Sequence, residues 1–235
     1  IAFVPASGRQ CTTLSTMFHS HLQGMPIIAE NGTYVVRDGI DISSSLIDPN
    51  LAHEVITGVR QLRDDGHDVG LVVDTKSMAY LERGDDPFVS HVATYYHSHT
   101  VVKDLTEHTD NVIKLSIYDF DEASDTTHPT MQRIAREHQV ILATPNWVDI
   151  MNPGVNKGSA VEAVQRDLGV TAGQTAIFGD FLNDLEMMPL AKWSFAMANS
   201  HPDIIRASNY VAPPNTDNGV ITVLSALLGV NVPTI

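Results

Sequence analysis

Several features are scarce in this sequence, and each scarcity excludes a class of protein. The 235 residues contain one cysteine, Cys11, which excludes an internal disulfide and fits a cytoplasmic location. Lys and Arg number 14 against 28 Asp and Glu, giving a net charge of −14, so we expect neither nucleic acid nor a membrane surface as a partner. The apolar stretch 219–230 is too short to cross a bilayer and predicts an amphipathic terminal helix.

Hydrophobic residues, in contrast, make up 43% of the chain, which supports a sizeable core. A chain of this length forms one large domain or two modest ones. No histidine pattern accompanies Cys11, so we expect its thiol to pack within a helix rather than to act as a nucleophile.

Strands and helices alternate in the two outer parts of the chain. The strands expected there lie at 1–6, 26–29, 175–178, 193–197 and 209–212. Helices are expected between them, including one that contains Leu185, Met187 and Met188. Alternation of this kind predicts an α/β fold, in which a doubly wound parallel sheet carries helices on both faces.

The middle third of the chain has a different pattern. Asp48-Pro49 opens a helix there, as a capping residue followed by proline commonly does. The other elements expected in this third are strands at 68–73, 112–118, 139–143 and 147–151 and a helix at 129–137. No glycine-rich fingerprint accompanies them, which indicates an inserted α+β module. We therefore expect a discontinuous core of residues 1–46 and 151–235 and an inserted domain of residues 47–150.

The most informative segment is Gly179-Asp180-Phe181-Leu182-Asn183-Asp184, which follows the apolar run of an expected strand. Ligands of open α/β sheets bind at the carboxyl ends of the strands. Carboxylates crowded there repel one another and lose hydration, so a hard cation is the usual remedy. Asp180, Asn183 and Asp184 therefore indicate a Mg²⁺ site. A helix start that Asn183 or Asp184 merely caps is the structural alternative.

Two further polar groups fall at strand ends of the outer parts. Ser7 offers a hydroxyl for substrate binding beside the amides of Gly8 and Arg9, and Lys157 lies at the start of a helix, whose free amides favour an anion. A hydroxyl, an ammonium and Mg²⁺ around one point are what a phosphoryl group requires. Taken singly, Ser7-Gly8 also fits a common turn and Lys157 a solvated side chain, but their order and spacing favour a phosphate site.

These motifs together resemble the haloacid dehalogenase (HAD) superfamily. Ser7-Gly8-Arg9, Lys157 and segment 179–184 are similar to its later motifs. The turn Glu30-Asn31-Gly32 and the segments 152–158 and 217–220 resemble its Cof-type sugar-phosphatase branch. The resemblance covers both outer parts of the chain and implies a Rossmann-like core. The middle part matches, in length and position, the α+β cap domain that this branch inserts.

The resemblance also implies roles for the candidate residues. Ser7 and Asn183 would hold the phosphate, and Lys157 would neutralise it. Asp180 would bind Mg²⁺ directly, and Asp184 would bind it through water or orient Lys157. The implied reaction is the hydrolysis of small phosphorylated metabolites, sugar phosphates above all, through an aspartyl-phosphate. The alternatives are a phosphomutase of the same architecture and a relative that binds a phospho-ligand without turnover.

One part of the family pattern is absent from the sequence. The nucleophile and the general acid of the family lie in a DxDxT motif that precedes the Ser-Gly-Arg motif, and the 235 residues contain no DxDxT. Asp119-Phe120-Asp121 has the DxD spacing, but it lies in the expected insertion, and we interpret it as a strand end. We therefore expect a segment upstream of Ile1 that carries the two aspartates. The substrate and the oligomeric state stay open.

The missing motif can be tested on the gene. The reading frame upstream of Ile1 should encode DxDxT within one βα unit of about 30 residues. Its absence would contradict an aspartyl-phosphate mechanism. The 235 residues by themselves should show no phosphatase activity, because they lack the nucleophile, and Mg²⁺-dependent turnover by them would be equally contradictory.

Overall fold

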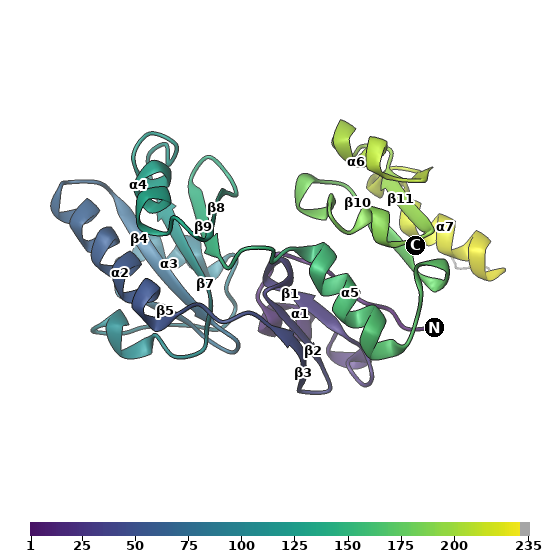
Figure 1. The fold of residues 1–235 in the computed structure, drawn as a ribbon, viewed down its shortest axis with the longest axis horizontal. Coiled ribbons are helices and arrows are strands. Elements are labelled where there is room, and N and C mark those ends of the chain that lie inside the picture. Colours follow the sequence, from purple (N-terminus) through teal and green to yellow (C-terminus); the bar gives the residue numbers. More distant parts are fainter. Residues whose placement is uncertain (231–235) are drawn as a thin grey trace. The chain divides into compact units, whose positions relative to one another are not determined.

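A computed structural model describes residues 1–230 of the chain, which forms two compact units (Figure 1). The first unit comprises Ile1–Val155 and the second Asn156–Ile235. The discontinuous core of residues 1–46 and 151–235 with its insertion at 47–150 therefore stays a prediction, and its last residues, 231–235, lie outside the described ones.

The first unit contains a small sheet and a large one. The strands of the small sheet pair antiparallel in chain order and are β1 (Ile27–Ala29), β2 (Tyr34–Arg37) and β3 (Ile40–Ser44). The large sheet has the order β6-β5-β4-β7-β9-β8. Its strands are β4 (Val69–Thr75), β5 (Ala79–Leu81), β6 (His99–Val101), β7 (Val112–Asp119), β8 (Gln139–Leu142) and β9 (Trp147–Met151). Its neighbouring strands pair antiparallel, except β5 and β6, which are parallel.

Helices cover both faces of the large sheet. The helices of the first unit are α1 (Cys11–Met17), α2 (Pro49–Asp64), α3 (Asp86–Ala93), α4 (Thr127–Ile134) and the 3-10 helices η1 (His19–His21), η2 (Glu30–Gly32) and η3 (Leu105–His108). In Figure 1, α2 and α4 lie side by side, and both pack on the face that carries Leu71 and Leu115. The side chains of α3 pack on the opposite face, against Val72 and Trp147.

The longest of these helices begins where the sequence predicts. The side chain of Asp48 accepts a hydrogen bond from the Asn50 amide at 2.7 Å, and Pro49 occupies the first turn. The predicted apolar stripe is buried in the core of the unit, and its residues are Leu51, Val55, Ile56, Val59 and Leu62. Cys11, which is buried at the start of α1, packs within a helix as predicted.

The second unit is built around a parallel sheet. Its strands, in sheet order, are β10 (Ala176–Gly179), β11 (Trp193–Met197) and β12 (Tyr210–Ala212). Its helices are α5 (Lys157–Leu168), α6 (Pro202–Ala207), α7 (Gly219–Leu228) and the 3-10 helices η4 (Ala172–Gln174), η5 (Leu182–Asp184), η6 (Met188–Leu190) and η7 (Asn215–Asp217). This alternation of parallel strands and helices confirms the α/β prediction. Among the described residues, no helix combines the length and apolarity that a membrane span needs.

Two elements differ from their prediction. Residues 1–6 form no strand but a single parallel bridge between Ala6 and Ile28, and Pro5 has no amide with which to extend that ladder. The helix expected at 185–188 is replaced by turns and by the two 3-10 helices η5 and η6. Pro189 explains this difference, because it cannot donate to the carbonyl of Leu185 and its ring would clash with it.

The first unit also buries a cluster of charged side chains. Lys114 of β7 forms an ion pair with Glu30, and its Nζ lies 3.8 Å from a carboxylate oxygen of Asp74 on β4. On the next strand, Asp149 accepts a hydrogen bond from Ser116 at 2.6 Å. Burial, followed by the charge of Glu30, raises the pKa of the Asp74 carboxyl well above its usual range. The cluster therefore favours the protonated form of Asp74.

The variant Asp74→Asn tests this protonation. Because folding raises the pKa of Asp74, its stabilising effect is fully present below the unfolded-state pKa of about 3.9 and is lost as the pH rises toward the folded-state value. The unfolding free energy of the wild type should therefore fall relative to the variant, by up to about 1.4 kcal/mol per pH unit in that window. Urea unfolding across a pH series measures the difference. A difference that is constant, or that moves in favour of the wild type, would contradict the protonation.

Candidate active site

The segment Gly179–Asp184 leaves β10 at its carboxyl end, where the sequence predicts a ligand site. β10 ends at Gly179, and η5 begins at Leu182. A Cβ at position 179 would lie 2.8 Å from Sδ of Met188 and 2.9 Å from Cβ of Asp184. Glycine is therefore required here, because only the absence of a side chain lets Asp184 approach the end of β10 this closely.

Asp184 is 5% exposed, and both of its carboxylate oxygens accept hydrogen bonds. Nζ of Lys157, itself 5% exposed, donates to Oδ1 at 2.7 Å. The backbone N–H of Asp180 donates to Oδ2 at 3.0 Å. The carboxylate thus joins the start of α5 to the loop after β10. Of the two roles predicted for Asp184, these contacts support the orientation of Lys157.

Lys157 is held at the first position of α5 by a local motif. The side chain of Asn156 accepts from the Ser159 amide at 2.9 Å, and the Ser159 hydroxyl accepts from the Asn156 amide at 3.2 Å, which forms a capping box. A Cβ on Gly158 would lie 2.6 Å from the carbonyl oxygen of Glu186, so α5 begins in close contact with that backbone. The burial and the ion pair of Lys157 rule out the solvated side chain considered as an alternative.

Asp180 and Asn183 are exposed, unlike Asp184. The capping alternative is wrong for this segment, because the residue before η5 is Phe181 and no side chain caps that helix. An exposed carboxylate at the end of a parallel strand fits a hard cation, which prefers oxygen ligands. No group of three or more His, Cys, Asp or Glu side chains in residues 1–230 could hold a metal ion, and the metal role of Asp180 stays a prediction.

Ser7 and Gly8 lie in the first unit, in the loop after the Ala6 bridge. The Ser7 hydroxyl accepts from the Arg9 amide at 3.1 Å, so the turn considered as the structural alternative is present, and the phosphate role of Ser7 stays a prediction. A Cβ on Gly8 would lie 3.0 Å from the side-chain oxygen and nitrogen of Asn31, which shows how tightly the loop packs.

The structure thus gathers part of the predicted set. Lys157, Asp180 and Asp184 are joined by hydrogen bonds in the second unit, and Asn183 lies on the same loop. The convergence of Ser7 with these residues stays a prediction, because Ser7 belongs to the other unit.

Two residues that sequence reasoning missed support the loop after β10. Ser200 donates from its hydroxyl to the carbonyl of Gly179 at 3.1 Å, and the backbone N–H of His201 donates to the carbonyl of Asp180 at 2.9 Å. Both follow β11, which lies beside β10 and parallel to it. The order of the strands is the signal that would have located them, since neighbouring parallel strands end at the same edge.

Asp119-Phe120-Asp121 is a strand end, as predicted. β7 ends at Asp119. The Asp119 carboxylate accepts from the Thr127 hydroxyl at 2.6 Å and from the Asp121 amide at 3.0 Å. The buried Asp119 carboxylate therefore binds the first residue of α4 and the backbone of Asp121. This structural role accounts for the DxD spacing without a catalytic role.

Two proteins named as phosphatases are similar to this chain over most of its length. It is 28% identical over 230 residues to the 5-amino-6-(5-phospho-D-ribitylamino)uracil phosphatase YbjI of Escherichia coli. The aligned residues cover 97% of this chain and 83% of the relative. It is 25% identical over 206 residues to the HMP-PP phosphatase of Cronobacter sakazakii. The aligned residues cover 85% of this chain and 72% of the relative.

Solved structures share the fold. A protein of Thermotoga maritima matches with a TM-score of 0.83 and 25% identity, over 99% of this chain and 85% of its own. A haloacid dehalogenase-like hydrolase of Bacteroides thetaiotaomicron has a TM-score of 0.85 at 20% identity, over 97% and 86%. A sugar phosphatase of HAD subclass IIB has a TM-score of 0.74 at 19% identity, over 97% and 85%. This likeness confirms the predicted fold class, the Rossmann-like α/β fold of HAD proteins.

The family itself is identified by a match over nearly the whole chain. Residues 1–224 match the family model described as haloacid dehalogenase-like hydrolase. The matched range includes the Ser7 loop, Lys157 and the segment 179–184, which carried the resemblance in the sequence. The chain therefore belongs to the haloacid dehalogenase-like hydrolase family.

Proposed function

We propose that this protein is a Mg²⁺-dependent phosphatase of small phosphorylated metabolites. The observation that carries the proposal is the buried contact of 2.7 Å between Lys157 and Asp184, next to the exposed carboxylate of Asp180. An ammonium held in place beside an open carboxylate supplies both a cation for a phosphate and a ligand for a metal ion.

Each residue of the site has a distinct part in this proposal. Lys157 neutralises the anionic substrate, and Asp184 orients the ammonium. Asp180 would hold Mg²⁺, which supplies charge neutralisation at the phosphoryl oxygens when bound. Ser7, with the amide of Gly8, and Asn183 would bind the phosphate. The nucleophile of the aspartyl-phosphate mechanism would be an aspartate upstream of Ile1, as the resemblance implies.

The names of relatives suggest the substrate class. YbjI is named for a phosphorylated ribityl compound, and a structural neighbour is named a sugar phosphatase. We therefore propose phosphorylated sugars and polyols as substrates. A cytoplasmic location fits the single cysteine, and the net charge of −14 disfavours nucleic acid and anionic membranes as partners.

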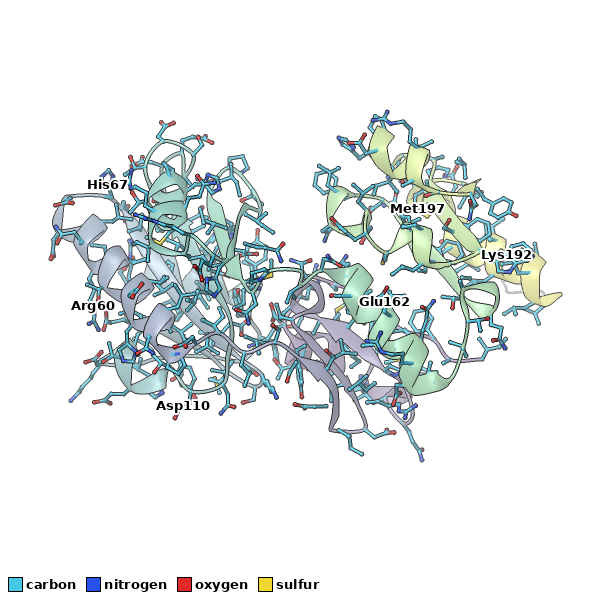
Figure 2. The ribbon with its side chains drawn as sticks, viewed as in Figure 1. Arg60, His67, Asp110, Glu162, Lys192 and Met197 are labelled. Atoms are coloured by element: carbon cyan, nitrogen blue, oxygen red, sulfur yellow. The ribbon has the colours of Figure 1, made fainter. Side chains whose placement is uncertain are left out.

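The direct test is a phosphate-release assay on the protein as its gene encodes it. A panel of phosphorylated sugars and polyols should be hydrolysed with Mg²⁺, and EDTA should abolish the activity. Asp180→Asn should lower kcat/KM by about 100-fold or more, because it removes the proposed metal ligand. Glu162→Gln is the control, since Glu162 is exposed on α5 and pairs only at 4.0 Å with Arg166 (Figure 2).

Three results of that assay would contradict the proposal. They are hydrolysis that does not need Mg²⁺, full activity of Asp180→Asn, and equal losses in Asp180→Asn and Glu162→Gln. Movement of phosphate between two positions of one sugar, without release, would identify a phosphomutase instead.

The variant Asp184→Asn separates the two roles of Asp184. If the carboxylate orients Lys157, the variant should lower kcat and should lower the unfolding free energy by about 3–5 kcal/mol, because a buried ammonium loses its partner. The Mg²⁺ concentration for half-maximal activity should not change. The double variant Lys157→Met/Asp184→Asn, which removes both charges, should be more stable than the single one. A higher Mg²⁺ requirement at unchanged kcat would show that Asp184 acts on the metal.

A further inference from the structure

The Ser7-Gly8-Arg9 loop is hydrogen-bonded to the turn Glu30-Asn31-Gly32 of the same unit. The backbone N–H of Asn31 donates to the carbonyl of Ser7 at 3.0 Å, and that of Glu30 donates to the carbonyl of Arg9 at 3.1 Å. The Asn31 side chain packs against Gly8. Any change in the backbone of the turn is therefore transmitted to the loop.

The turn has a backbone conformation that needs outside support. Glu30 has φ 50° and Asn31 has φ 55°, so two successive residues with side chains lie in the left-handed region. Such residues are uncommon, and they persist where the surrounding structure holds them. No side chain caps the η2 helix that they form.

The support comes from the large sheet. The Glu30 side chain is 1% exposed and forms an ion pair with Lys114 of β7, which is 4% exposed. These two residues are 84 positions apart in the chain. Nζ of Lys114 also lies 5.3 Å above the ring of Tyr96, whose hydroxyl donates to Ser116 at 3.1 Å. The Lys114 ammonium, which pairs with Glu30, is therefore itself held in the interior of the first unit.

A second contact ties the other end of the loop to the same part of the chain. Gln10 directly follows Arg9 and is 1% exposed. Its side-chain amide donates to the carbonyl of Ser98 at 2.9 Å and accepts from the Ser98 amide at 3.0 Å. Ser98 immediately precedes β6, an edge strand of the large sheet.

We propose that Lys114 is a positioning residue for the substrate phosphate: through Glu30 it holds the turn that shapes the Ser7-Gly8-Arg9 loop. The part of the chain expected to be the cap would then determine how tightly that loop binds phosphate. This role rests on the proposed function, in which Ser7 and Gly8 bind the phosphate.

Calorimetric titration with inorganic phosphate, on the protein as its gene encodes it, tests the role without turnover. Lys114→Met should weaken phosphate binding by about tenfold or more, because small shifts of a binding loop are costly. In assays KM should rise more than kcat falls, and Lys114→Arg should restore part of the affinity. The Glu30 and Asn31 amides should exchange hydrogen faster in Lys114→Met.

Arg60→Met is the matched control. Arg60 lies on α2 (Figure 2) and forms ion pairs with Glu82 and Asp104 in the same unit, but it has no contact with the loop or the turn. Its loss should destabilise the unit and leave phosphate affinity unchanged. Should Lys114→Met not fold, Glu30→Gln/Lys114→Met removes both buried charges and should show the same loss of affinity.

The outcomes are distinguishable. If Lys114→Met binds phosphate as tightly as the wild type, the positioning role is overturned and the proposed function stays in place. The same holds if Arg60→Met loses as much phosphate affinity as Lys114→Met. If the wild type neither binds inorganic phosphate nor hydrolyses the phosphorylated substrates, both the positioning role and the proposed function are overturned.

Discussion

The ion pair between Lys157 and Asp184 is the interaction on which the candidate site depends. Taking two charges out of water is costly, and the cost is offset only when the geometry satisfies both partners. Here Asp184 accepts from Lys157 through one oxygen and from the Asp180 amide through the other. The same carboxylate therefore places the cation and shapes the loop that presents the Asp180 side chain.

Several local features exist to let this pair form. A Cβ at Gly179 or Gly158 would lie less than 3 Å from neighbouring atoms, so both positions need glycine. The capping box of Asn156 and Ser159 fixes the first turn of α5. The motif glycines and the capping residues are thus explained by packing around the buried pair, whereas the Asp180 side chain stays exposed.

The first unit uses buried charge in a comparable way but for a different purpose. The single ammonium of Lys114 faces more than one carboxyl group, those of Glu30 and Asp74. The raised pKa of the Asp74 carboxyl favours its protonated form, so the cluster needs no second cation. What the cluster stabilises is a left-handed turn beside the Ser7 loop. In both units a lysine is kept inside the protein to hold a loop in place.

Much of the fold is predictable because its signals are local. The Asp48 N-cap and the apolar stripe specify α2, and the strands β7 and β11 are rich in apolar residues. The helix expected at 185–188 is absent because Pro189 prevents it. The Lys157 and Asp180 motifs are visible because each is a short segment. The bond of Lys114 to Glu30 was not predictable, since 84 residues separate the partners and only the sheet brings them together.

In the proposed site, the Lys157 ammonium, the Asp180 carboxylate and the Ser7 loop all serve one phosphate. An experimental structure of the protein as its gene encodes it, grown with Mg²⁺ and inorganic phosphate, tests this most directly. We expect Mg²⁺ on the Asp180 carboxylate and a phosphate within hydrogen-bond distance of both Lys157 Nζ and the Ser7 hydroxyl. A phosphate bound elsewhere, or Ser7 on a different face from Lys157, would contradict it.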